Sequence, residues 1–145
     1  MKIEGIATDI PLAMAGAMVG YLLGGWTAAL GYLLTLQGID IVTGIFQAAN
    51  EKKLNSTDMR QGIYRKLGVW FLLILANFAD ELLFDGQGIA TTAITFTFIG
   101  QEGISIIENL ANIGLPIPDQ LTQFFSKIQG KGDSILGDQD DEIQG

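Results

Sequence analysis

Five polar side chains recur at spacings that bring them to one side of a helix, within an otherwise apolar segment. Thr91, Thr95, Glu102, Ser105 and Asn109 lie at offsets 0, 4, 11, 14 and 18, which is close to one face at 3.6 residues per turn. The threonines alone say little, because such hydroxyls often bond back to their own helix. A carboxylate within a membrane helix costs on the order of 3 kcal/mol to insert. We therefore expect this polar face to contact helix partners or to line a water-filled lumen, not to face lipid.

Candidate partners for the carboxylate occur in two other segments. They are a short motif directly after the first long apolar segment and a basic pair before the second segment: Asp40, Thr43, Gly44, Arg65 and Lys66. No nucleophile with a base, phosphate-binding glycine loop or metal-ligand cluster can be recognised. The chain also has no Cys and no His, which excludes thiolate, imidazole and ordinary zinc chemistry. We predict that the protein is not an enzyme and has no catalytic residues, no metal and no cofactor.

A second face, near the N-terminus, consists of small residues. Ala13, Gly16, Ala17, Gly20 and Gly24 lie at offsets 0, 3, 4, 7 and 11. In lipid, such a face lets helix backbones approach closely. One GxxxG spacing is weak evidence, because small residues are common in membrane helices, but five members in one stripe favour a helix-association face.

Long apolar segments must position these faces. Residues 10–39 contain no charge, and shorter apolar segments follow at 67–79 and 86–101. About 20 apolar residues cross the roughly 30 Å of hydrocarbon in a bilayer, so the chain is predicted to be an all-α, polytopic membrane protein. One helix over the first segment would be about 45 Å long, and Gly24-Gly25 is the expected bend. The predicted helices are at about 6–23, 26–47, 63–84 and 89–109.

Three of these helices are firm transmembrane predictions, whereas the helix at 6–23 is short and either crosses the membrane or is re-entrant. A cleavable signal peptide is the alternative for the N-terminus, but its apolar stretch is normally about 7–15 residues and this one is about twice as long. Five of the eight basic residues lie in or beside the loop at 48–62. The positive-inside rule places that loop in the cytoplasm, with the turn at 85–88 outside and the C-terminus cytoplasmic.

The C-terminal end is polar and acidic. The last membrane helix should stop at Gly114, Pro116 and Pro118, which closes a transmembrane domain at 1–118. Residues 119–128 predict a short amphipathic segment on the inner membrane surface. Residues 129–145 predict a disordered acidic tail that the function of the protein does not need, because acidity and low hydrophobicity oppose packing. The net charge of -8 also argues against nucleic acid as a partner.

Four motifs carry a specific resemblance. They are Leu-Gly-Gly-Trp at 23–26, Asp-Ile-Val-Thr-Gly at 40–44, the Lys-Lys-Leu-Asn-Ser loop at 52–56, and the long string at 102–118. Over roughly residues 20–125 the chain resembles the phage-lysis and toxin-secretion holin family of Gram-positive bacteria and their phages. The resemblance implies a protein of the bacterial cytoplasmic membrane that forms homo-oligomers and opens timed lesions, through which an endolysin reaches the cell wall.

The partners that follow are the lipid bilayer, other copies of the chain and an antiholin, with the endolysin as a functional partner that is not bound directly. Two other functions fit the same residues. A small ion channel or transporter subunit would use the carboxylates as ion sites. A membrane anchor or antiholin would bind without permeabilising the membrane.

Overall fold

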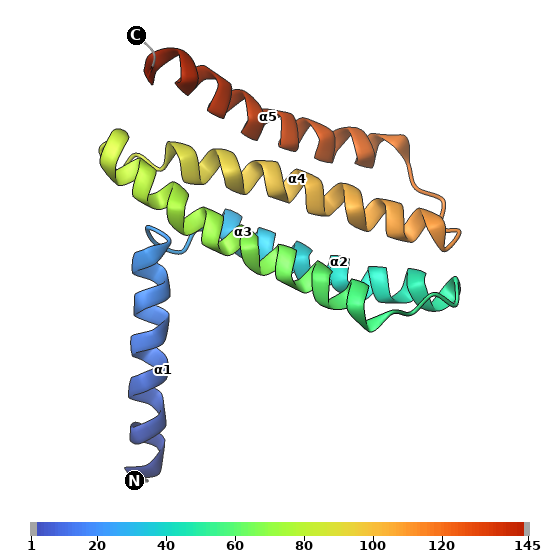
Figure 1. Cartoon of the computed structure of the whole chain (residues 1–145), viewed down its shortest axis with the longest axis horizontal. Coiled ribbons are helices and arrows are strands. Elements are labelled where there is room, and N and C mark those ends of the chain that lie inside the picture. The colour runs from blue at the N-terminus through green and yellow to red at the C-terminus, as the bar shows by residue number, and fades with distance from the viewer. Residues whose placement is uncertain (1–2, 144–145) are drawn as a thin grey trace.

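The computed structural model describes residues 3–143, with side chains described over residues 9–139. Over this range the chain is helical, without strands, and the all-α prediction is confirmed. The helices are α1 (Ile3–Leu22), α2 (Ala28–Asn50), α3 (Ser56–Leu83), α4 (Ile89–Asn112) and α5 (Asp119–Ile143). Helices α2 to α5 form one body, and α1 points away from it (Figure 1).

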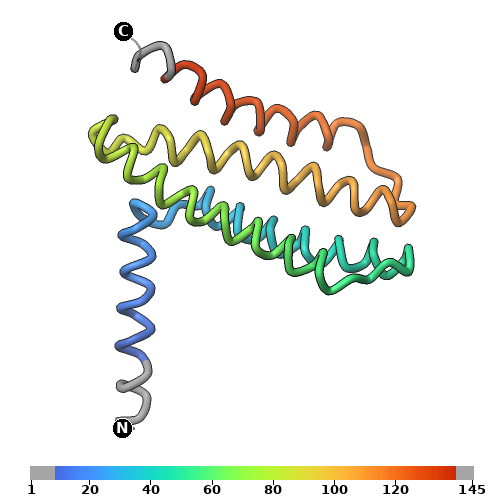
Figure 2. Tube along the Cα trace, viewed as in Figure 1, coloured from blue at the N-terminus to red at the C-terminus, as the bar shows by residue number. Residues whose placement is uncertain are grey.

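Helix α4 lies in the middle of this body. It packs against α5 on one side and against α2 and α3 on the other (Figures 1 and 2). The core is small: Leu30, Leu33, Val69, Leu73 and Ile99 meet between α2, α3 and α4. Because so few large apolar side chains are buried, polar contacts between the helices contribute much of what fixes their relative positions.

A two-glycine turn ends α1, as the sequence predicts. Gly24 and Gly25 have φ values of 72° and 104°, which glycine adopts without a steric cost. The Asn77 side-chain amide on α3 donates a hydrogen bond to the carbonyl of Leu22 at 3.1 Å. This contact ties the end of α1 to the body.

Helix α3 begins earlier than predicted, at Ser56. Asn55 has extended backbone angles and its side-chain oxygen accepts a hydrogen bond from the Thr57 amide at 3.0 Å, which is an N-cap. The predicted loop at 48–62 is therefore wrong in length, and only residues 51–55 connect the two helices. The basic residues after position 55 lie on a helix.

The C-terminal end differs most from the sequence prediction. The sequence predicts disorder from residue 129, whereas in the structure α5 continues as one helix to Ile143. The physical reason is a close contact with α4: a Cβ added at Gly103 would overlap the Phe125 ring, and one at Gly132 would overlap the α4 backbone. The average hydrophobicity of the segment does not reveal this contact, because the contact depends on glycines, whose lack of a side chain lets the two helices approach closely.

One described helix, α2, is long and apolar enough to cross a bilayer by length and composition. The stretch Asp9–Leu22 is apolar but shorter. Helix α3 carries charges near both ends, and α4 contains several Thr, Gln and Glu residues. The prediction of three firm spans is therefore not confirmed by composition.

Candidate functional site: a charge cluster between three helices

Three largely buried charged side chains meet where α2, α3 and α4 come together. Lys66 Nζ on α3 lies 2.9 Å from an Asp40 oxygen on α2 and also forms an ion pair with Glu102 on α4. The three side chains are only 14%, 15% and 9% exposed respectively. Two carboxylates and one ammonium leave this charge cluster (Asp40, Lys66, Glu102) with a formal charge of about -1. One cation thus holds three helices together, and removing it would leave two buried anions without compensation.

Asn109 extends the cluster toward the C-terminal end of α4. Its side-chain amide donates hydrogen bonds to Asp40 Oδ1 at 3.0 Å and to Thr43 Oγ1 at 3.1 Å. The backbone of Gly44 is close enough that an added Cβ would lie 3.6 Å from the same amide nitrogen. The Asp-Ile-Val-Thr-Gly motif therefore forms the surface of α2 on which Asn109 rests.

A cavity of about 430 Å³ opens beside the charge cluster. Besides the cluster itself, its lining includes Arg65 and Ser105. A space of this size accommodates several water molecules, which can solvate the charge that Lys66 does not compensate. Lys66 rather than Arg65 forms the ion pairs, which selects one of the two bases that the sequence proposes.

The predicted polar face of α4 is directed at other helices in this structure. Glu102 and Asn109 contact α3 and α2, as described, and Thr91 contacts Asp80 on α3. The Thr95 hydroxyl, 2% exposed, instead donates to the carbonyl of Thr91 at 2.6 Å, as threonines in helices often do. The five residues therefore do not share one site: they are distributed along the whole length of α4.

Asp80 is a site residue that the sequence reasoning did not select. Its side chain is 1% exposed and accepts hydrogen bonds from the amides of Ala90 and Thr91, at 2.6 and 2.9 Å, and from the Thr91 hydroxyl at 2.6 Å. The signal was available, because Gly88 at the N-cap of α4 offers no side chain. An acid from the preceding helix supplies the missing cap, where it also meets the positive end of the helix dipole.

Gln37 and Trp70 form a second missed contact, between α2 and α3. Gln37 is 4% exposed, accepts a hydrogen bond from the Trp70 indole at 2.9 Å and donates to the Lys66 carbonyl at 3.4 Å. Trp26 stacks on Trp70, with ring centroids 5.9 Å apart. A lone Gln in an apolar run was the available signal. These contacts hold α2 next to the backbone of Lys66 on α3, the lysine of the charge cluster.

The predicted helix-association face lies on α1. Ala13, Gly16, Ala17 and Gly20 are on the part of α1 that extends away from the body, and an added Cβ at either glycine would meet nothing within 4 Å. Gly24 is different, because its Cβ would overlap the Asn77 side chain. Four of the five residues thus remain available to another helix, and the fifth belongs to the turn.

Large exposed apolar side chains on α2 and α3, a few internally paired charges and a projecting apolar helix are features of small helical membrane proteins. Residues 17–130 match the model of the Bacteriophage holin family. The chain belongs to this family, and the resemblance found in its motifs is confirmed. The matched range includes the charge cluster and the first half of α5.

Individual relatives agree with the family match. The chain is 36% identical over 116 residues to a protein of Bacillus phage phi105 described as a probable holin, covering 80% of this chain and 84% of that protein. It is 40% identical over 111 residues to the uncharacterised YqxH of Bacillus subtilis, covering 77% and 78%. It is 33% identical over 130 residues to an uncharacterised protein of Clostridium perfringens, covering 88% and 96%. No solved structure matches the chain.

Proposed function

We propose that the protein is a holin that accumulates in the cytoplasmic membrane of a bacterial host, forms homo-oligomers and opens timed lesions through which an endolysin reaches the cell wall. The observation that carries this proposal is the family match over residues 17–130, which spans nearly all of the helical body. The relative from phage phi105 supports a lytic role, since it is itself described as a probable holin.

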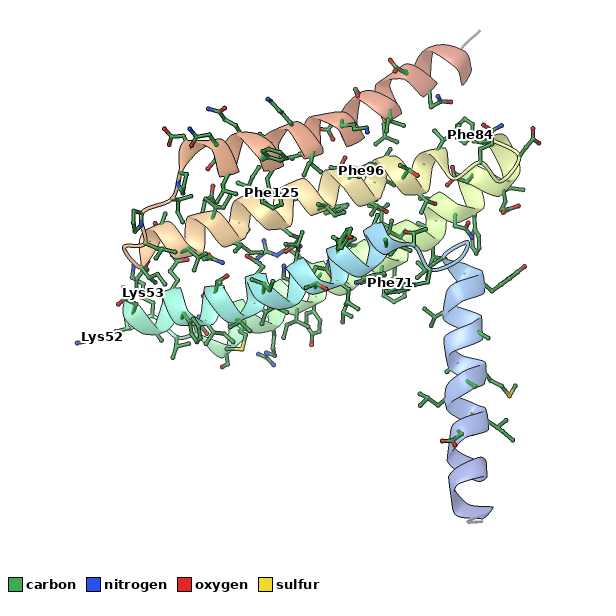
Figure 3. The ribbon with its side chains drawn as sticks, turned by 180° about the vertical axis from the view of Figure 1, so that it is seen from behind. Lys52, Lys53, Phe71, Phe84, Phe96 and Phe125 are labelled. Atoms are coloured by element: carbon green, nitrogen blue, oxygen red, sulfur yellow. The ribbon has the colours of Figure 1, made fainter. Side chains whose placement is uncertain are left out.

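The surface of the protein supports membrane residence and association. Large apolar side chains of α2 and α3 are exposed, among them Tyr32, Phe46, Phe71 and Leu75, and a bilayer would cover them. On α1 the small residues face open space, which suits packing against another copy. We propose that α2, α3 and α4 cross the membrane with the 51–55 connection, which carries Lys52 and Lys53, in the cytoplasm. Figure 3 shows both lysines at the tip of this connection.

The charge cluster suits a protein that must first be stable and later rearrange. Its ion pairs link α2, α3 and α4 within one copy. Because the cluster contains one more carboxylate than ammonium groups, it is held less firmly than a matched pair. We propose that the time of triggering depends on this balance.

The test is induced expression in a bacterial host with continuous measurement of membrane potential, with and without a cytoplasmic endolysin. A holin produces a delay, an abrupt depolarisation, and lysis only when the endolysin is present. Ion leakage without endolysin-dependent lysis would indicate a channel or transporter subunit instead. Normal membrane levels without depolarisation would indicate an anchor or an antiholin, and either result would refute the proposal.

A further inference from the structure

The side of α5 that points away from α4 carries no apolar side chain. Its exposed members recur along one stripe of the helix and are Gln123, Ser126, Lys127, Gly130, Ser134 and Asp138. The exposed apolar residues of α5 (Leu121, Phe124 and Leu136) fall outside this stripe on a helical projection. The outer face of α5 (these six residues) is therefore suited to water.

The opposite side of the body is suited to lipid. There α3 exposes Phe71 by 69%, Leu75 by 61% and Phe78 by 45%, and α2 exposes Tyr32 by 66%. Since α4 lies between α5 and the pair α2 and α3 (Figure 1), the body has one polar and one apolar surface. A protein surrounded by lipid on all sides would not be built in this way.

The attachment of α5 to α4 is specific. An added Cβ at Gly100 would overlap the backbone at Gln129, and Gly103 receives the Phe125 ring, which points from α5 toward α4 in Figure 3. The Thr97 hydroxyl donates to Asp133 at 3.0 Å. Contacts at successive positions of α4 thus involve successive positions of α5 in reverse order. The two helices run antiparallel over much of their length.

Charge completes the alignment of the two helices. The Lys131 ammonium lies 5.2 Å from the centre of the Phe96 ring on α4, at a distance where a cation and an aromatic face attract each other. If α4 crosses the membrane, α5 must therefore lie at the same depth, and its outer lysine and aspartate residues cannot be left in hydrocarbon.

We propose that α5, docked on α4, forms the wall that faces water in the assembled lesion. Copies arranged with α2 and α3 toward lipid and α5 toward a common centre would satisfy both surfaces at once. The inference rests on the proposed holin function, because it assigns one helix of the chain to the passage that a holin opens.

The first experiment loosens α5 with a matched pair of variants. Gly132→Ala places a methyl group against the carbonyl of Ala93 and the amide of Thr97, whereas an added Cβ at Gly130 meets nothing within 4 Å. Both changes raise helix propensity equally. Full-length protein is inserted into vesicles at equal amounts, and release of a trapped fluorescent dextran is recorded. We expect release about ten-fold slower for Gly132→Ala, from the cost of overpacking, and unchanged for Gly130→Ala.

The second experiment locks α5 in place. Because the chain has no native Cys, Thr97→Cys with Asp133→Cys can be oxidised to a single disulfide between α4 and α5. We expect the locked protein to release dextran at the rate of the parent. In locked, assembled protein, a third cysteine at Ser126 should react with a water-soluble maleimide, whereas one at Leu75 on the apolar side of α3 should not.

The outcomes separate the two proposals. If the unmodified protein releases no dextran, the holin function itself fails and the inference fails with it. If the unmodified protein releases dextran but locking α5 stops release, α5 must leave α4 for lesions to form and the inference alone is overturned. Equal release by Gly132→Ala and Gly130→Ala, or equal labelling at positions 126 and 75, would also overturn it.

Discussion

Replacing Lys66 by methionine should destabilise the protein strongly, because this lysine is the cation shared by two buried carboxylates. Breaking a buried ion pair by removing one partner costs about 3–5 kcal/mol, and the low exposure of all three side chains places this site in that class. For a domain of this size each kcal/mol corresponds to about 2–4 °C in the melting temperature. We therefore expect a decrease of about 6–20 °C.

The assay is thermal unfolding of the purified protein in detergent, followed by circular dichroism. Arg65→Met is the matched control: it removes the same charge from the neighbouring position of α3, but Arg65 is exposed and an exposed charge contributes little to stability. The triple variant Lys66→Met with Asp40→Asn and Glu102→Gln removes all three charges, and we expect it to recover most of the lost stability.

The same cluster should set the time of lesion formation. Glu102→Gln leaves Lys66 with Asp40 as a balanced pair, so we expect the onset of depolarisation to shift at matched protein levels. If Lys66→Met melts at the same temperature as the Arg65→Met control, the cluster does not hold the helices together. If Glu102→Gln and Glu102→Leu both depolarise the membrane at the same time as the parent, the cluster does not set the time of lesion formation. Glu102 would then be an ordinary residue at the membrane interface.

Three further predictions test other parts of the molecule. Asp80→Ala should destabilise the protein by about 2 kcal/mol or more, because it removes the N-terminal cap of α4 and three hydrogen bonds. Asp80→Asn should lose less stability. Equal melting temperatures for both variants and the parent would contradict the capping role. Gly16→Leu and Gly20→Leu should slow the appearance of crosslinked oligomers in membranes, because close approach of two helices needs a face of small residues. The melting temperature should not change, because both positions face open space within one copy. The control Met18→Leu should change neither the oligomerisation rate nor the melting temperature. Before triggering, a cysteine at Ser56 should label from the cytoplasmic side and one at Gln87 from the outer side, because the basic residues are concentrated near position 56. Labelling of position 56 from outside would show that the orientation is reversed.

The helices could be predicted from the sequence because apolar runs and their interruptions are local features. The bend at Gly24-Gly25 and the stop after Asn112 follow from glycine and proline chemistry. The start of α3 was missed because the charged residues of its first turns look like a loop, although Asn55 is a standard N-cap residue.

The polar contacts could be predicted only as a set of candidates. Spacing placed Glu102 and Asn109 on one face, but it could not show that Lys66 rather than Arg65 turns inward, since adjacent helical positions differ by about 100°. The cap that Asp80 provides depends on how α3 and α4 are brought together by their turn, and no local pattern encodes that. The part of α5 beyond residue 128 was missed for the reason already given: its contact with α4 depends on glycines.

The docked position of α5 also bears on the predicted location of the C-terminus. Gly132 lies against Ala93 and Thr97, so the end of α5 is near the turn at 85–88 and far from the connection at 51–55 (Figure 1). If that connection is cytoplasmic, a docked α5 and a cytoplasmic C-terminus cannot occur together. The positive-inside rule does not decide between them, because acidic residues contribute little to it.

The decision comes from the cost of placing the polar outer face of α5 in lipid. Lys127 lies on the stretch of α5 that packs against Gly100 and Gly103 in the middle of α4. A lysine near the centre of a bilayer costs about 2.5–3.5 kcal/mol on insertion scales, and no water surrounds it in a newly inserted single copy. Such a copy is more stable with α5 left on the cytoplasmic surface. Assembly removes the cost, because neighbouring copies enclose water. On this argument docking of α5 is coupled to oligomerisation, so the disulfide between positions 97 and 133 should form slowly in freshly inserted protein and rapidly once crosslinked oligomers appear. A disulfide that forms equally fast in dilute single copies would show that α5 docks independently of assembly.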